Sequence, residues 1–244
     1  TMEGKAIHNV QNAMFAAAMA WAMGVKLDDI RHGLRTFDNS FFQAPGRMNV
    51  YDELGFKVIL DYGHNPHAIE AMCNLVDRLS DGTGMRTKRV VLLTAPGDRR
   101  DEDILRIAAR AACSFDLFIC KEDDDARGRE RGSVAKMMRD ALVEAGVQPA
   151  AIHIVPDEVE ALDLGLRSCR DGDLLLVFGD QLTRCWKQII YYGREHDGAV
   201  QVIEQPAWRP APPAPEPVPV QLPQGALVMD ERGVRVARAP EPND

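Results

Sequence analysis

The chain is short of positive charge and of long apolar runs. Its 29 lysines and arginines stand against 37 aspartates and glutamates, which gives a net charge of −8 over 244 residues. Nucleic acids and anionic membranes attract net basic surfaces, so this balance argues against both as broad partners. No apolar run approaches the roughly 20 residues of a membrane-spanning helix. We therefore expect neither a nucleic-acid partner nor a membrane partner.

Cysteine is sparse and unpatterned. The five cysteines are odd in number, scattered along the chain and without a C-x-x-C pair. This favours neither a disulfide framework nor a zinc knuckle, and a reducing cytoplasm is the simplest compartment for it. His64 and His67 have the spacing of one helix face, but no third ligand is evident. We therefore expect no metal site there.

Several nucleotide and hydrolase motifs are missing as well. The sequence contains no G-x-x-x-x-G-K-[ST], no G-x-G-x-x-G after a predicted strand and no G-x-S-x-G. The first of these motifs cradles nucleotide phosphates. The chain therefore does not carry a complete nucleotide-hydrolysing site.

Both ends of the chain differ in pattern from the middle. Residues 1–44 are predicted to be helical, and the stretch 9–23 is apolar nearly all round although no strand nearby could cover it. Residues 206–223 hold eight of the fifteen prolines, which indicates a linker. The runs 226–229 and 234–237 beyond it are predicted to form a short hairpin.

The middle segment, residues 45–205, alternates short apolar, β-branched runs with helical patterns. The predicted strands are 57–61, 89–94, 115–120, 152–155 and 174–178, and the predicted helices are about 66–79, 101–113, 131–146, 157–168 and 180–192. This alternation is typical of βαβ units. We therefore predict an α/β fold with a mostly parallel sheet and helices on both faces, with 48–53 as an added strand.

Polar residues cluster directly after the predicted strands. The first strand is followed by the segment 61–66, the second by 95–101 and the third by 121–129. In an open parallel sheet, ligands bind outside the carboxyl ends of the strands. These segments therefore predict a functional site along one rim of the sheet.

The residues of this rim also have ordinary structural interpretations. Asn65 before Pro66 is a good helix N-cap, and Asp157 with Glu160 resembles a capping box. Asp61 could hold a ribose, and a nearby imidazole could hold a phosphate. From spacing alone, a structural and a functional role remain equally open there.

The segment 121–129 has two interpretations. A run of four carboxylates at 122–125 could be a solvated loop, which is common for charge runs. Its position at a strand end, followed by Arg127 and Arg129, favours a recognition loop instead. Carboxylates could hold a guanidinium, and arginines could clamp a carboxylate through two parallel hydrogen bonds.

Five stretches together resemble the Mur-type ATP-dependent ligases, a superfamily that includes peptidoglycan-precursor ligases and folylpolyglutamate synthase. The stretches are 8–13, 44–48, 61–66, 97–103 and 121–129. The last two resemble most closely the branch that adds arginine to the β-carboxyl of aspartate in a poly-aspartate chain. The resemblance covers about residues 1–195, and it is specific as a set. The fold that it implies is the Rossmann-like C-terminal domain of these ligases.

The resemblance implies ATP and Mg²⁺ as cofactors, an acyl phosphate intermediate, arginine and a poly-aspartate chain as substrates, and a homo-oligomer. It implies that the helix with His8, Asn9 and Asn12 faces adenine and that Arg47 reaches the phosphates from a hinge. Asp61 and His64 would contact ribose and phosphate. The predicted catalytic residues are Arg47, Asp61 and His64. The same three residues are predicted to bind the nucleotide, together with His8, Asn9, Asn12 and Asn65. The predicted substrate-binding residues are Asp98, Arg99, Glu122, Asp123, Asp125, Arg127 and Arg129.

The resemblance also predicts the domain organisation. Residues 1–44 would be the helical end of a central ATP-binding domain, 45–205 the C-terminal ligase domain, and 206–244 a linker with a short tail. The P-loop and the magnesium ligands would lie upstream of Thr1, so the chain alone is expected to be inactive. Two alternatives are another Mur-type ligase, peptidoglycan or folylpolyglutamate, and a non-catalytic α/β module that binds a nucleotide or mediates assembly.

Overall fold

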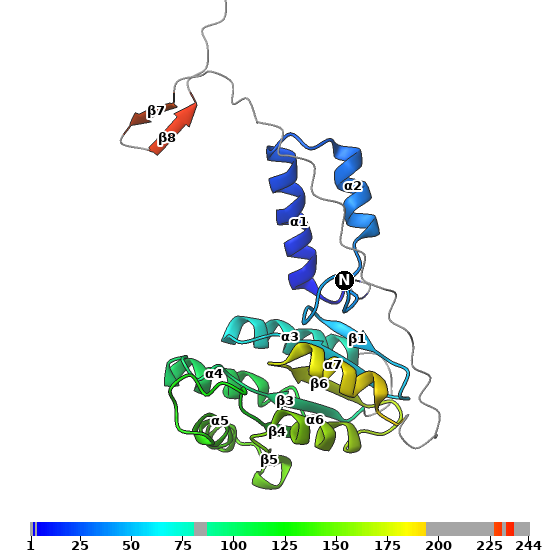
Figure 1. Cartoon of the computed structure of the whole chain (residues 1–244), viewed down its shortest axis with the longest axis vertical. Coiled ribbons are helices and arrows are strands. Elements are labelled where there is room, and N and C mark those ends of the chain that lie inside the picture. The colour runs from blue at the N-terminus through cyan, green and yellow to red at the C-terminus, as the bar shows by residue number, and fades with distance from the viewer. Residues whose placement is uncertain (1, 3, 81–86, 194–226, 231–232, 237–244) are drawn as a thin grey trace, which may run out of the picture. The chain divides into compact units, whose positions relative to one another are not determined.

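The computed structural model describes residues 2, 4–80, 87–193, 227–230 and 233–236. The chain divides into two compact units, Thr1–Ala199 and Val200–Asp244. The first unit contains a layered α/β body and two further helices (Figure 1). None of the described helices is long and apolar enough to cross a membrane.

A six-stranded sheet in the order β1-β2-β6-β3-β4-β5 forms the centre of the first unit. Its strands are β1 Asn49–Tyr51, β2 Lys57–Asp61, β3 Arg89–Leu93, β4 Leu117–Cys120, β5 Ile152–Ile154 and β6 Leu174–Phe178. All neighbours pair in parallel except β1, which runs antiparallel to β2 at one edge. The added strand predicted at 48–53 is this edge strand.

Helices cover both faces of this sheet (Figure 1). They are α3 Pro66–Ser80, α4 Asp101–Ala111, α5 Ser133–Glu144, α6 Glu158–Arg167 and α7 Leu182–Tyr191, with a 3₁₀ turn at Pro149–Ala151. Ile59 and Val91 face one core with α3, α4 and α5, whereas Leu60 and Leu92 face the other with α6 and α7. Successive side chains of a strand point to opposite faces, so fully apolar strands need cover on both sides. The predicted α/β fold class is confirmed.

Two further helices, α1 Ile7–Ala22 and α2 Leu27–Thr36, precede the sheet. Ala6 lies in the core beside α3, but α1 itself has no buried residue. Trp21 is 73% exposed and Phe15 68% exposed. The apolar helix expected here is therefore present, and none of its residues is buried in the described structure.

The second unit contains an antiparallel pair, β7 Leu227–Asp230 and β8 Gly233–Val236. This matches the predicted hairpin. The proline-rich segment 206–223 lies outside the described residues, and the three-domain division stays a prediction.

Candidate functional site

The carboxyl ends of four parallel strands lie next to one another and carry the predicted site segments. The strands β2, β6, β3 and β4 end at Asp61, Phe178, Leu93 and Cys120, in that spatial order. The segments that follow these strands therefore share one rim. The nucleotide-binding and substrate-binding residues predicted from the sequence fall at opposite ends of this rim.

The first end of the rim is built around Arg47 and Asp61. The backbone N–H of Met48 donates to Asp61 Oδ2 at 2.9 Å, which places the preceding residue Arg47 beside this carboxylate. Met48 is buried and has a positive φ of 54°, a conformation that non-glycine residues adopt only where contacts impose it. Arg47 is exposed, and its guanidinium makes no hydrogen bond or ion pair within the described part of the chain. It is therefore free to reach a ligand.

Asn49 and Asn39, which the sequence analysis did not select, give the Arg47 segment its shape. The amide nitrogen of Asn49 donates to the carbonyls of Asn39 and Ala44 at 2.8 and 2.9 Å, and its oxygen accepts from Gly46 N–H at 2.7 Å. Asn39 in turn donates to the carbonyl of Met48 at 2.8 Å. Asn49 is fully buried, so each of these bonds satisfies a group that water does not reach. A buried asparagine in a loop has no distinctive local sequence pattern.

The environment of Asp61 differs from that of an ordinary surface carboxylate. Burial raises its pKa, while the Met48 N–H bond and the positive charge of Arg47 act in the opposite direction. His64 lies two residues beyond the adjacent Tyr62, with Nδ1 3.0 Å from the Tyr62 carbonyl. A carbonyl can only accept, so Nδ1 donates to it, which leaves Nε2 as the ring nitrogen that can meet a ligand. The pair offers one carboxylate and one imidazole toward a ligand.

Two of the rim residues act as helix caps. Asn65 Oδ1 accepts from Ala68 N–H at 2.9 Å at the start of α3, and Pro66 is the first helical residue. Asp157 accepts from Glu160 N–H at 2.9 Å and caps α6. Each cap satisfies a backbone donor that the helix leaves unpaired. The structural roles considered from the sequence are thus present; a nucleotide contact by Asn65 stays a prediction.

The first turn of α1 lies next to the Arg47 segment. Asn9 Nδ2 contacts Met48 Sδ at 3.9 Å, and Asn12 Nδ2 donates to Asn9 Oδ1 at 3.5 Å. Burial lowers the pKa of His8. Part of the predicted adenine-facing helix therefore lies beside the predicted phosphate- and ribose-binding residues.

At the other end of the rim, Glu122 and Arg129 are engaged within the protein. Glu122 is buried, and it accepts from the N–H groups of Gly132 at 2.6 Å and Val134 at 3.0 Å, at the start of α5. Arg129 donates to the carbonyl of Arg99 and to Asp101 Oδ1, both at 2.6 Å. These contacts tie the segment after β4 to α5 and to the segment after β3.

The two segments also touch through their backbones. A Cβ at Gly97 would overlap the carbonyl oxygen of Ala126, so only glycine permits this approach. The cavity enclosed between the segments, which Asp123, Asp125 and Arg129 help to line, has a volume of about 10 Å³. That is roughly the space of one water molecule. An amino acid therefore cannot enter between these loops in this conformation.

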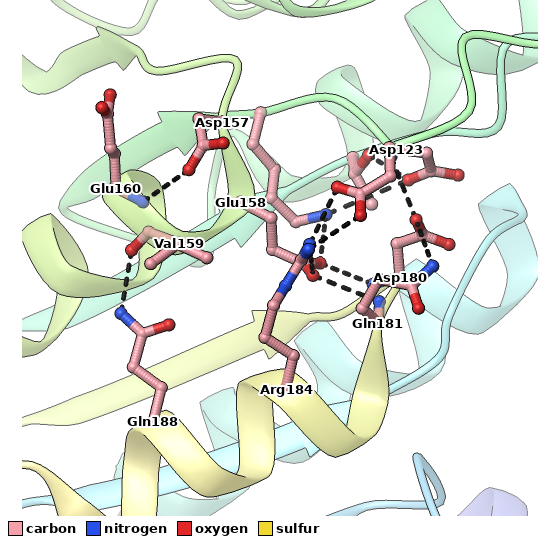
Figure 2. A network of polar contacts seen from close by, with 12 residues as sticks. Asp123, Asp157, Glu158, Val159, Glu160, Asp180, Gln181, Arg184 and Gln188 are labelled. Carbon is pink, nitrogen blue, oxygen red and sulfur yellow. Dashed lines mark hydrogen bonds and ion pairs between the residues drawn. The ribbon is translucent and has the colours of Figure 1, made fainter.

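A buried ionic network underlies the segment after β4 (Figure 2). Lys121 is fully buried, with Nζ 2.9 Å from Glu158 Oε1 and 3.9 Å from Asp123 Oδ1. Asp123 also accepts from the Thr94 hydroxyl at 2.7 Å. Burial raises the pKa of Asp123, and the charge of Lys121 only partly offsets this.

The network continues from Glu158 to α7 (Figure 2). Glu158 accepts from Asp180 N–H at 2.7 Å, from Gln181 N–H at 3.2 Å and from Arg184 Nη2 at 2.7 Å. Arg184 also forms a two-bond pair with Asp124, at 2.8 Å for each bond. Burial alone would raise the pKa of Glu158, but Lys121 and these hydrogen bonds lower it to about 2. The network joins the ends of β4, β5 and β6.

The sequence analysis did not select Lys121, Glu158 or Arg184. These three residues lie far apart in the chain, and an isolated Lys, Glu or Arg is usually exposed at the protein surface. Only the placement of Lys121 directly after an apolar strand could have indicated burial.

The exposed part of the rim is formed by Asp98 and Arg127, both predicted to bind substrate. The Arg127 guanidinium lies 3.3 Å from both oxygens of Asp98. Hydrogen bonding and charge from Asp98 raise the pKa of Arg127. Asp125 lies beside them and accepts from Arg127 N–H at 2.9 Å.

The described residues contain no group of three or more His, Cys, Asp or Glu side chains that could hold a metal ion. The side chains that face the rim are instead arginines, carboxylates and amides, which suit phosphate, hydroxyl and ammonium or guanidinium groups. The arrangement therefore fits a nucleotide and a charged small molecule.

Comparison with known proteins gives relatives that are similar in sequence over most of this chain. A cyanophycin synthetase of Crocosphaera subtropica is 38% identical over 184 residues, covering 75% of this chain and 20% of that protein. A UDP-N-acetylmuramoyl-L-alanyl-D-glutamate–2,6-diaminopimelate ligase of Solibacter usitatus is 26% identical over 172 residues, 70% of this chain and 32% of that protein. The chain thus spans about one fifth of the cyanophycin synthetase.

Solved structures agree on the fold. The structure of Escherichia coli FolC in complex with ADP, without folate substrate, matches with a TM-score of 0.56 and 21% identity, over 75% of this chain and 40% of that one. A family model described as Mur ligase, glutamate ligase domain, matches residues 46–181. That span runs from the glycine before Arg47 to the first residues after β6 and includes the whole rim. The chain therefore belongs to the Mur ligase family.

Proposed function

We propose that this chain supplies the ATP-facing and amino-acid-binding rim of a ligase that adds arginine to the β-carboxyl of aspartate in a poly-aspartate or cyanophycin chain. The family and the cyanophycin synthetase relatives support an ATP-dependent amide ligase. The observation that carries the proposal is that Asp61 at the end of β2 and the Asp98–Arg127 pair beyond β3 and β4 lie on one rim of the sheet. Such a rim can hold the nucleotide and the substrate that carries the attacking amine close together.

In the proposed reaction, ATP transfers its γ-phosphoryl group to the aspartate carboxylate and gives an acyl phosphate and ADP. The α-amine of arginine then attacks the acyl carbon, the amide bond forms, and inorganic phosphate leaves with the electron pair of the C–O bond. Arg47 stabilises the phosphate charge, since its guanidinium is exposed and has no hydrogen bond or ion pair within the described residues. Asp61 accepts from a ribose hydroxyl, and His64 donates or accepts through Nε2. The amide of Asn9 or Asn12 and the ring of His8 would face the adenine.

Mg²⁺ would neutralise the phosphates in this reaction. The described residues offer no cluster for it, so its ligands would come from outside them. The sequence has no P-loop either. We therefore expect the chain alone to release no phosphate from ATP, and we expect the complete ligase to be a homo-oligomer in the cytoplasm.

For the substrate, we assign direct contacts to the exposed residues Asp98, Asp125 and Arg127. Arg127 would hold the α-carboxylate and Asp98 the guanidinium, after exchanging the present Arg127–Asp98 pair for the two ends of the substrate. Such an exchange is inexpensive because exposed ion pairs contribute little net free energy. The contacts of Glu122, Asp123, Arg129 and Arg99 fit the task of holding the loops in place.

The test uses the complete ligase with the chain's residues changed. Asp98→Asn should weaken arginine binding and reduce discrimination against citrulline, which has the shape of arginine without its charge. Arg127→Gln should reduce discrimination against agmatine, which lacks the α-carboxylate. ATP affinity should stay unchanged in both, and Glu102→Gln and Arg131→Gln, exposed changes of the same kind nearby, should have no effect.

Unchanged selectivity in both variants would contradict the assignment of arginine. The diaminopimelate ligase relative makes a peptidoglycan-type ligase the second candidate. Tight, saturable binding of diaminopimelate with no binding of arginine would favour that candidate. ATP binding with no amide product from any amino acid would favour a non-catalytic module.

A further inference from the structure

The segment that carries Arg47 is attached to the α/β body at two places. At one place, Gly46 N–H bonds to Asn49, and the Gly46 carbonyl accepts from Tyr62 N–H at 2.8 Å. Gly46 has a φ of +67°, and a Cβ there would lie 2.5 Å from Leu182 of α7. The backbone directly before Arg47 is therefore packed against the first turn of α7.

The second attachment is an aromatic stack between the same segment and the same helix. The rings of Phe41 and Trp186 have centroids 5.0 Å apart and are parallel to within 1°. Tyr51, on the edge strand β1, meets Trp186 edge-on at 6.0 Å and 81°. Trp186 therefore contacts one aromatic ring from the segment before Arg47 and another from the strand after it.

Of the two adjacent phenylalanines Phe41 and Phe42, it is Phe41 that stacks on Trp186. Phe41 packs against the core that α6 and α7 share, whereas Phe42 is 92% exposed. The hydrogen bonds of Asn49 and Asn39 close the segment upon itself, so they fix its internal shape. The Phe41–Trp186 stack and the Gly46–Leu182 packing fix that shape against α7.

We propose that Trp186 and Phe41 are positioning residues that hold Arg47 at the place where it stabilises the phosphate charge. The proposal rests on the function proposed above for Arg47. Within the described residues the Arg47 guanidinium has no hydrogen bond or ion pair, so its position follows the position of its backbone. Charge stabilisation depends steeply on geometry, because a misplacement of about 1 Å can cost about 10²-fold in rate.

The expected signature is a loss in kcat with little change in the KM for arginine. In the complete ligase, Trp186→Ala and Phe41→Ala should each lower kcat about 10-fold, within the range for such misplacement. Trp186→Phe keeps a ring in the stack and should restore most of the rate. Phe42→Ala is the matched control and should leave kcat nearly unchanged, because its ring is 92% exposed and meets only the edge of Phe41, at 6.5 Å, outside the stack with Trp186 among the described residues.

A double-mutant cycle separates positioning from a general loss of structure. Arg47→Ala alone should lower kcat strongly, and adding Trp186→Ala should then lower it no further. An equal 10-fold loss with and without Arg47 would overturn the proposal, as would wild-type kcat in both Trp186→Ala and Phe41→Ala. Should Trp186→Ala fail to fold, Phe41→Ala and Trp186→Phe carry the same comparison.

The cycle also distinguishes the failure of this inference from the failure of the proposed function. A wild-type rate in Arg47→Ala would remove the catalytic role of Arg47, and the positioning role with it. A slow Arg47→Ala variant beside fast aromatic variants would leave the proposed function intact and remove only the positioning role.

Discussion

The rim carries two ionic groups built from the same residue types in very different surroundings. Lys121 and Glu158 are 0% and 1% exposed at their side chains, and Glu158 has further partners in Arg184 and two backbone N–H groups. Arg127 and Asp98 are 34% and 57% exposed at their side chains and have mainly each other. A buried charge that loses its partner is costly, whereas an exposed charge regains water. The buried group is therefore suited to hold strand ends together, and the exposed group is suited to exchange partners.

The largest expected effect comes from removing one charge of the buried group. Lys121→Met should lower the free energy of unfolding by about 3–5 kcal/mol, because Glu158 and Asp123 remain buried with less compensation. Arg127→Met should leave the free energy of unfolding nearly unchanged, because its charge is exposed. Urea denaturation of the isolated chain measures both. Equal losses in the two variants would break the comparison.

The buried group should also make the free energy of unfolding depend on pH in the acid range. The pKa of Glu158 is about 2 in the folded chain and 4.5 ordinarily, so its contribution is present above pH 4.5 and is lost as the pH falls toward 2. The free energy of unfolding should fall by about 3 kcal/mol over that window. Burial raises the pKa values of Asp61 and Asp123. These two carboxyls therefore lower the free energy of unfolding at the higher pH values where they ionise.

The charge of Lys121 is the main influence that lowers the pKa of Glu158, so Lys121→Met should flatten this acid dependence. Denaturation midpoints at a series of pH values from 2 to 6 measure it. An acid dependence of the same steepness in the Lys121→Met variant would show that other carboxylates are responsible.

The smallest expected effect concerns what holds the exposed group in place. Gly97→Ala should cost about 1–3 kcal/mol, because the added methyl overlaps the Ala126 carbonyl and separates the two loops. Gly33→Ala in α2, where a Cβ meets nothing within 4 Å, should instead stabilise by about 0.5–1 kcal/mol. Thermal unfolding of the pair checks both signs. A neutral Gly97→Ala would mean that the loops separate freely.

The order of elements followed from local pattern. Five apolar strands, the helices between them and the polar segments after the strands were predictable, because a strand buried on both faces needs a continuous apolar run and a helix needs an apolar stripe. The position of the rim followed from the same pattern, since the carboxyl ends of parallel strands meet at one edge. Family resemblance added the roles of Arg47, Asp61 and His64, which spacing left open.

The partners of the charged and aromatic residues depended on tertiary structure. Glu122 and Asp123 are adjacent acids in one run, yet one caps α5 and the other joins Lys121 and Thr94. Trp186 and Phe41 stack across most of the described chain. Sequence pattern reports whether a side chain prefers water or the core, because that preference is a property of the residue. Which charge neutralises which is a property of distance, and distance is set only when the strands have taken their order in the sheet.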